Sequence, residues 1–150
     1  MARFNDKIAW VTGASTGIGR ETAIRLYKEG AEVILSARSA DKLHALRDSV
    51  EKPQRLHVVP VDLMDQEATE RAIDEARDWR GRIDVLVNNA GISQRGEALE
   101  TDMATVRNIM ELNFFAPIAL TRAIAPKMVE RGEGRIAVVS SVAVYVATPK

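Results

Sequence analysis

The feature that most constrains the fold is a glycine-rich turn near the N-terminus. The segment Ile8–Gly19 reads Ile-Ala-Trp-Val-Thr-Gly-Ala-Ser-Thr-Gly-Ile-Gly, so an apolar stretch ends at Thr12 and three glycines follow. A helical pattern begins directly after the last glycine. A strand, a glycine-rich turn and a helix start form a phosphate cradle, because the helix N-terminus offers free N–H groups and partial positive charge. We expect Gly13 to allow the sharp turn, Gly17 to let a diphosphate approach, and Gly19 to let the helix pack tightly on the sheet.

The rest of the chain alternates apolar stretches with helical patterns. The predicted strands are 7–12, 32–37, 56–61, 83–88 and 135–140, and the predicted helices are 18–29, 40–50, 66–79 and 102–131. Strands rich in Val, Ile and Leu, with little alternation, are typical of parallel sheets buried on both faces. The sequence therefore predicts an α/β fold, a Rossmann-type doubly wound parallel sheet of five strands in the order 3-2-1-4-5.

Composition excludes several other classes of protein. Lys plus Arg and Asp plus Glu are both 21 among 150 residues, so the formal net charge is zero and neither nucleic acid nor a membrane surface is an expected partner. The chain has no cysteine, which excludes disulfides and thiolate ligands and fits a reducing compartment. We find no signal-peptide pattern and no apolar run long enough to cross a bilayer. We therefore expect a cytoplasmic protein without a metal site.

The end of the second predicted strand distinguishes between two dinucleotides. A site that prefers NAD usually places a carboxylate there to hold the ribose hydroxyls. This chain has Arg38 and Ser39 instead. Because a guanidinium can bind a 2′-phosphate with two hydrogen bonds, and the serine can add a hydroxyl, we predict NADP rather than NAD. The alternative is that Arg38 is a solvated surface residue.

Together with Thr12 and Ile18, the glycine turn resembles the Thr-Gly-x-x-x-Gly-x-Gly turn of the short-chain dehydrogenase/reductase family. Three further segments resemble family motifs in the same order along the chain: Asn88-Asn89-Ala90-Gly91, Asn113 and Ser140-Ser141. The resemblance extends from about Lys7 to the last residue. It implies that 1–150 is a dinucleotide-binding domain, the N-terminal cofactor-binding portion of the family fold.

The resemblance also implies roles for individual residues. The implied cofactor-binding residues are Thr12, Gly13, Ser15, Thr16, Gly17, Ile18, Gly19, Arg38, Ser39, Asp62, Leu63, Asn89, Ala90 and Gly91. Asp62 is expected to accept a hydrogen bond from the adenine amino group. Asn113 is expected to hold a water of the proton relay, and the Ser141 hydroxyl is expected to hold the substrate oxygen.

Each of these polar residues also has a structural interpretation. Asp62 can be a loop carboxylate, 88–91 a plain turn and Ser141 a strand-end hydroxyl. Asn113 falls on an apolar helix stripe that includes Ile109 and Pro117, where a buried amide needs partners and can bond to backbone. Pro117 lacks the N–H that would bond back to the Asn113 carbonyl, so that carbonyl is expected to be open to another donor.

The family's catalytic tyrosine, with a lysine four residues later, would begin about thirteen positions after the serine. This chain ends at Lys150. Tyr145 is followed by Pro149 at the fourth place, and Tyr27 belongs to the first predicted helix. We therefore expect a chain truncated before the pair, with the C-terminal part of the family fold missing. Its long helix should then expose apolar side chains, to be covered by further polypeptide or in a homo-oligomer.

The function that the resemblance implies is an NADP-dependent oxidoreductase. Hydride would move between nicotinamide and a carbonyl or secondary alcohol of a small-molecule substrate. A non-catalytic dinucleotide-binding module and a truncated inactive fragment remain as alternatives.

Overall fold

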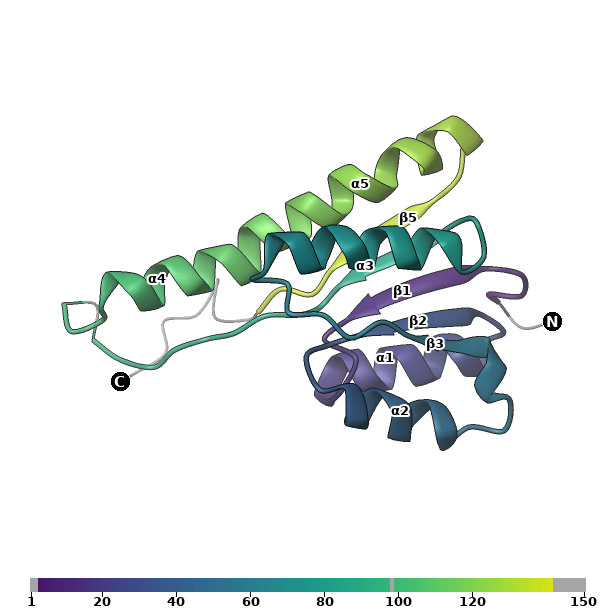
Figure 1. Cartoon of the computed structure of the whole chain (residues 1–150), viewed down its shortest axis with the longest axis horizontal. Coiled ribbons are helices and arrows are strands. Elements are labelled where there is room, and N and C mark those ends of the chain that lie inside the picture. The colour runs from purple at the N-terminus through teal and green to yellow at the C-terminus, as the bar shows by residue number, and fades with distance from the viewer. Residues whose placement is uncertain (1–2, 98, 142–150) are drawn as a thin grey trace.

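The computed structural model describes residues 3–97 and 99–141, which form a five-stranded parallel sheet with helices packed against it (Figure 1). The strands are β1 (Ile8–Thr12), β2 (Glu32–Ser36), β3 (Leu56–Val58), β4 (Val85–Asn88) and β5 (Arg135–Val138). The helices are α1 (Gly17–Lys28), α2 (Ala40–Asp48), the 3₁₀ turn η1 (Pro53–Arg55), α3 (Gln66–Asp78), α4 (Met103–Met110), the π-helical turn η2 (Glu111–Phe115) and α5 (Ala116–Arg131). None of the helices in these ranges combines the length and the apolar content that a membrane span requires.

The sheet has the order β3-β2-β1-β4-β5 with parallel neighbours, which confirms the predicted topology. All five strands are shorter than predicted, β1 and β2 by one residue and the others by two or three. β3 ends at Val58, although the N–H groups of Val59 and Val61 still donate to the carbonyls of Leu35 on β2 and of Ala37 after it. Pro60 between them lies on the edge strand with its nitrogen turned away from β2, where a missing N–H costs no ladder bond. β5 ends at Val138, and the next N–H still donates to the Asn88 carbonyl at 2.9 Å.

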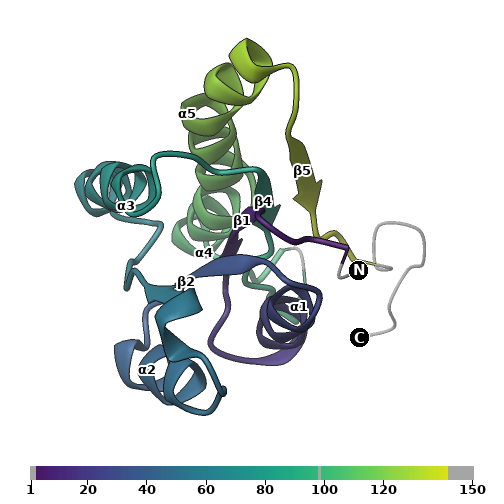
Figure 2. The same ribbon diagram turned by 90° about the vertical axis from the view of Figure 1, so that its right-hand side faces the viewer.

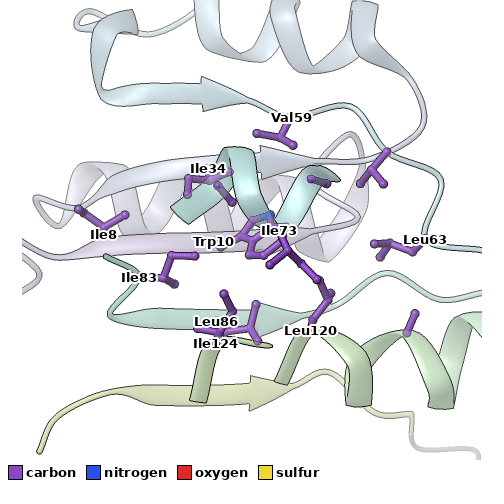
Figure 3. Close-up of a cluster of buried hydrophobic side chains, with 14 of the residues drawn as sticks. Ile8, Trp10, Ile34, Val59, Leu63, Ile73, Ile83, Leu86, Leu120 and Ile124 are labelled. Carbon is purple, nitrogen blue, oxygen red and sulfur yellow. The ribbon is translucent and has the colours of Figure 1, made fainter. Parts of the chain in front are cut away.

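Helices cover both faces of the sheet, so the fold is doubly wound. Figure 2 shows α1 and α2 on one side and α3 and α5 on the other. Each side has its own apolar cluster, because successive residues of a strand point to opposite faces. On β1, Ala9 and Val11 join the α1–α2 cluster, whereas Ile8 and Trp10 join the α3–α5 cluster drawn in Figure 3.

The predicted helix 102–131 is one rod made of α4, η2 and α5 (Figure 1). In η2, the Ala116 N–H donates to the Glu111 carbonyl five residues back. The wider turn lies directly before Pro117, which has no N–H for the ordinary bond to residue 113. A helical pattern alone does not reveal this local change of hydrogen bonding.

Only part of the predicted apolar stripe on this rod is buried. Leu120, Ile124 and Met128 lie in the core, but Asn113 is exposed, so the expectation of a buried amide there is wrong. Large apolar side chains on the rod and on β5 are exposed, as the sequence predicted for the long helix. They are Met103, Val106, Met110, Phe114, Phe115, Ile118, Val129, Ile136 and Val138.

Asp84 fastens the opposite, amino-terminal edge of the sheet. This buried residue precedes β4, and its Oδ2 accepts the Ile8 N–H at 2.8 Å. The same carboxylate lies 3.2 Å from the Arg82 guanidinium and 3.6 Å from that of Arg131. Its main chain bonds to Ile8 and to Arg135, so one residue connects the starts of β1 and β5.

Replacement of Asp84 by alanine should therefore destabilise the fold. The Ile8 N–H would lose its buried acceptor and two arginines would lose a charged partner, which predicts a loss of about 2 kcal/mol in the free energy of unfolding. Urea unfolding followed by circular dichroism measures this loss. Asp74→Ala, which removes an exposed carboxylate from α3, is the control and should change stability by less than about 0.5 kcal/mol. Equal losses in both variants would contradict this account.

Candidate functional site

A cleft lies at the carboxyl ends of the parallel strands, between the glycine turn, the end of β2, and the segments that follow β3 and β4. It is lined by Gly13, Ser15, Thr16, Ser36, Ala37, Arg38, Ser39, Val61, Asp62, Leu63, Asn89, Ala90, Gly91, Ile92 and Leu112. Ligands bind in open α/β sheets at this edge, beside the point where the strand order reverses. The fold thus brings together residues from five separate segments of the sequence.

Most of the predicted cofactor residues line this cleft. The exceptions are Thr12, which ends β1, and Gly17, Ile18 and Gly19, which begin α1 beside the cleft. Sequence reasoning missed Ser36, Ala37, Val61, Ile92 and Leu112, which also line the cleft. Three of these five, Ala37, Val61 and Ile92, directly adjoin predicted cofactor residues in sequence, and that adjacency was the available signal.

Two of the glycines have backbone conformations that favour glycine. Gly13 has φ of +65°, and a Cβ there would lie 2.7 Å from the Asn89 Nδ2. Gly17 has φ of +55°, and apart from its chain neighbours and the backbone of α1 itself, no atom of the described residues lies within 4 Å of where its Cβ would be. The space beside Gly17 is therefore open, which fits a backbone that a ligand approaches closely.

Gly19 has a different role from the one predicted. A Cβ there would clash with the Gly13 carbonyl oxygen, in the glycine turn, and with the Asn89 amide, in the loop after β4. The missing side chain therefore lets the start of α1 approach the glycine turn itself.

The N-terminus of α1 faces this turn without a side-chain cap. Thr16 occupies the N-cap position but makes no capping hydrogen bond, and the first turn of the helix carries no acidic residue. By contrast, α3 and α4 are capped by Asp65 and Asp102, which accept the N–H groups of residues 68 and 105. Hydrogen bonds from Thr105 hold the pKa of Asp102 below its usual range. An uncapped helix start can instead bind an anion.

Thr12 and Asn89 fasten the ends of β1 and β4 to each other. The buried Thr12 Oγ1 accepts the N–H groups of Asn89 and Ala90, both at 3.0 Å, and donates to the Val87 carbonyl at 3.3 Å. The Asn89 Nδ2 donates to the carbonyls of Thr12 at 3.0 Å and Gly13 at 3.3 Å. These bonds hold the glycine turn against the loop after β4, so 88–91 is more than a plain turn.

At the end of β2 the cleft carries a positive charge. Arg38 is exposed, and no hydrogen bond or ion pair engages it within residues 3–97 and 99–141. Ser39 follows as the N-cap residue of α2, yet its side chain makes no capping hydrogen bond. Asp62 is exposed and its Oδ1 accepts the Met64 N–H at 3.0 Å, so it is a turn-forming carboxylate on the cleft wall.

The two predicted catalytic residues lie outside the lining of the cleft. The Asn113 amide bonds to the main chain of Ile92, with Oδ1 accepting the N–H at 2.9 Å and Nδ2 donating to the carbonyl at 2.7 Å. Asn113 thereby fixes the residue after Gly91, and its side chain has the structural role that the sequence left open. Ser141 is exposed and lies three residues beyond the end of β5.

The described part of the chain holds no tyrosine at the cleft. The Tyr27 hydroxyl, on α1, accepts the Lys52 N–H at 3.0 Å, away from the lining residues. Tyr145 and Lys150 lie outside the described residues. Nor do residues 3–97 and 99–141 place three or more acidic or histidine side chains where they could hold a metal ion.

A parallel sheet of this order, with a glycine turn and an uncapped helix start at its carboxyl edge, is a Rossmann-type nucleotide-binding fold. The comparison with family models narrows the class. The model described as short chain dehydrogenase matches residues 7–150, and the chain belongs to this family. The resemblance noted from the sequence is therefore confirmed, and members of this family are oxidoreductases that use NAD or NADP.

Individual relatives agree with this assignment. The chain is 38% identical over 149 residues to human dehydrogenase/reductase SDR family member 7, covering 96% of this chain and 44% of the relative. It is 37% identical to family member 7B of Xenopus tropicalis, covering 99% of this chain and 50% of the relative. The chain thus spans about half the length of the curated relatives it matches.

Solved structures give the same picture. A short-chain dehydrogenase from Streptomyces avermitilis matches with a TM-score of 0.89 and 37% identity, covering 98% of this chain and 53% of that one. A 7α-hydroxysteroid dehydrogenase, solved with NADH and 7-oxo glycochenodeoxycholic acid, matches with a TM-score of 0.91 and 31% identity. That match covers 98% of this chain and 58% of the other.

Thr12→Val should destabilise the site and the fold together. The substitution keeps the shape of the side chain but leaves the Asn89 and Ala90 N–H groups without their acceptor. We expect the free energy of unfolding to fall by about 2–4 kcal/mol, measured by urea unfolding. Thr12→Ser keeps the hydroxyl and is the matched control, with an expected loss of about 1 kcal/mol for the missing methyl. If valine is tolerated as well as serine, the hydroxyl does not hold the two strand ends.

Proposed function

We propose that this chain binds NADP, and that it is the cofactor-binding part of an oxidoreductase acting on a carbonyl or secondary alcohol. The observation that carries the proposal is the Arg38 guanidinium, which lines the same cleft as the glycine turn and which no side chain or main chain of the described residues engages. A dinucleotide with a 2′-phosphate supplies an anion for the guanidinium and a second anion, the pyrophosphate, for the turn. NAD lacks the first of these.

The pyrophosphate would be held by the turn and the start of α1. The N–H groups at this helix start have no side-chain acceptor, and Gly17 leaves open space in front of the backbone. Both features favour an anion at close range. Asn89, Ala90 and Gly91 form the facing wall, held in place through Thr12.

The adenosine end would lie between the end of β2 and the segment after β3. Arg38 and Ser39 would bind the 2′-phosphate, since both residues line the cleft and neither side chain has a hydrogen bond within the described residues. Asp62 would accept the adenine amino group. Its turn with Met64 uses one carboxylate oxygen, Oδ1, and holds the side chain at the wall. Leu63 would contact the base.

The bound nicotinamide would supply or accept the hydride. The Ser141 hydroxyl would hold the substrate oxygen. The Asn113 side-chain amide is engaged by Ile92. The main-chain carbonyl of Asn113, within the π-helical turn η2, is therefore the group that would accept a hydrogen bond from the relay water. The side chain would act indirectly, by fixing the loop after Gly91.

A second candidate is a chain that binds NADP without turning over a substrate. It is favoured by the absence of a tyrosine from the cleft within the described residues. Two measurements separate these functions. Binding of NADPH, detected by the change in NADPH fluorescence, is expected in both cases. Oxidation of NADPH on addition of ketones or aldehydes is expected only of the oxidoreductase.

Homo-oligomer formation is also part of the proposal. Large apolar side chains are exposed on α4, η2 and α5. Among them, Phe114 and Phe115 each leave about half of their surface open to solvent. Many large apolar side chains exposed on one helical rod favour association with another copy or with further polypeptide. The choice between these partners rests on the oligomeric state in solution.

Gly17→Ala should weaken dinucleotide binding without unfolding the chain. A Cβ there would occupy the open space proposed for the pyrophosphate, and we expect the NADPH Kd to rise by about tenfold or more by titration calorimetry. Gly132→Ala is the matched control, because Gly132 also has positive φ and an open Cβ position but ends α5, away from the cleft. Both variants should lose about 1 kcal/mol of stability from backbone strain. A similar Kd for both variants would rule out a pyrophosphate beside Gly17.

Arg38→Asp tests the choice of cofactor. The carboxylate would repel a 2′-phosphate and could hold ribose hydroxyls, so the NADPH Kd should rise by about 10- to 100-fold while the NADH Kd stays equal or falls. Arg71→Asp, an exposed arginine on α3, controls for the charge change. An unchanged ratio of the two Kd values in Arg38→Asp would defeat the phosphate role of Arg38.

A further inference from the structure

A buried hydrogen bond connects the core to the end of β2. Trp10 on β1 is fully buried within the α3–α5 cluster (Figure 3). Its indole N–H donates to the Oγ of Ser36 at 2.8 Å, and Ser36 is only 1% exposed. A buried indole N–H needs an acceptor, because leaving it unpaired is costly. The indole therefore fixes the rotamer of one hydroxyl at the last position of β2.

Ser36 is also a junction of the main chain at the cleft. Its carbonyl accepts the N–H of Ala14, in the glycine turn, at 3.0 Å. The carbonyl of the next residue, Ala37, accepts the Val61 N–H at 3.1 Å. Main-chain bonds thus hold residues 36 and 37 between the glycine turn and the segment before Asp62. The hydrogen bond from Trp10 holds the Ser36 side chain from the side of the hydrophobic core.

Arg38 follows two residues later and, in the described structure, no hydrogen bond or ion pair engages its side chain. The direction in which its guanidinium projects therefore depends on the backbone at Ser36 and Ala37. A site that must meet a phosphate gains affinity when its supporting residues hold the binding group in place beforehand.

We propose that Trp10 and Ser36 are positioning residues for cofactor choice: their hydrogen bond holds the end of β2 so that Arg38 meets the 2′-phosphate of NADP. This inference rests on the proposed NADP binding. It adds that a tryptophan in the hydrophobic core, with no contact to the ligand, sets the preference for NADPH over NADH.

The experiment measures NADPH and NADH Kd values by titration calorimetry for the parent chain, Ser36→Ala and Trp10→Phe. Each substitution removes one partner of the hydrogen bond, so a folding defect in one variant does not end the test. We expect the NADPH Kd to rise by about fivefold in each variant, with the NADH Kd within about twofold of the parent. Ser49→Ala removes a serine hydroxyl that bonds to a carbonyl at the far end of α2, and it should change neither value.

The same substitutions in an Arg38→Ala background separate positioning from a general structural role. If Ser36 acts through Arg38, Ser36→Ala in this background should change the NADPH Kd by less than about twofold. A fivefold change that persists without Arg38, or equal changes for NADPH and NADH, would overturn the inference. The inference would also be overturned if the preference for NADPH over NADH is lost in Arg38→Ala but unchanged in both Ser36→Ala and Trp10→Phe. A parent chain that binds neither nucleotide would overturn the proposed function, and the inference with it.

Discussion

The hydroxyl of Thr12 is the point on which the architecture of the cleft depends. Thr12 is the last residue of the central strand, and its hydroxyl accepts the N–H groups of two residues in the loop after β4. These two donors lie 77 and 78 residues further along the chain. The Asn89 amide returns two hydrogen bonds to the carbonyls of Thr12 and Gly13. Because Thr12 is buried and Asn89 and Ala90 are only partly exposed, losing these bonds would be costly. These bonds within the protein hold the glycine turn against the loop after β4.

Whether a helix start has a side-chain cap depends here on whether it lies beside the cleft. Helices α3 and α4 begin with aspartates that accept their first N–H groups, whereas α1 and α2 begin at the cleft without a side-chain cap. Capping normally adds stability, so its absence at the two helix starts beside the cleft leaves donors for another acceptor. The proposed cofactor presents phosphates at both places, the pyrophosphate at α1 and the 2′-phosphate near Ser39.

The sequence predicted the architecture well because its signals are local. Apolar runs identified all five strands, and the spacing of Gly13, Gly17 and Gly19 placed the turn. The sequence could not predict the π-helical turn at Glu111–Phe115. The apolar stripe of a helix is nearly unchanged when one N–H donates to the carbonyl five residues back instead of four. The apolar stripe also predicted a buried position for Asn113, which is exposed in the structure. The stripe cannot give this result, because the burial of a helix residue depends on which elements pack against that part of the helix. The close approach of Gly19 to the Gly13 carbonyl is likewise a tertiary contact, invisible in the spacing.

The most direct test of the account is a crystal structure of this chain with NADPH. The account predicts pyrophosphate oxygens within hydrogen-bond distance of the main-chain N–H groups at the start of α1, around Gly17–Gly19, with the Thr12–Asn89 bonds unchanged. A pyrophosphate bound elsewhere on the chain, with this turn left without a ligand, would contradict it.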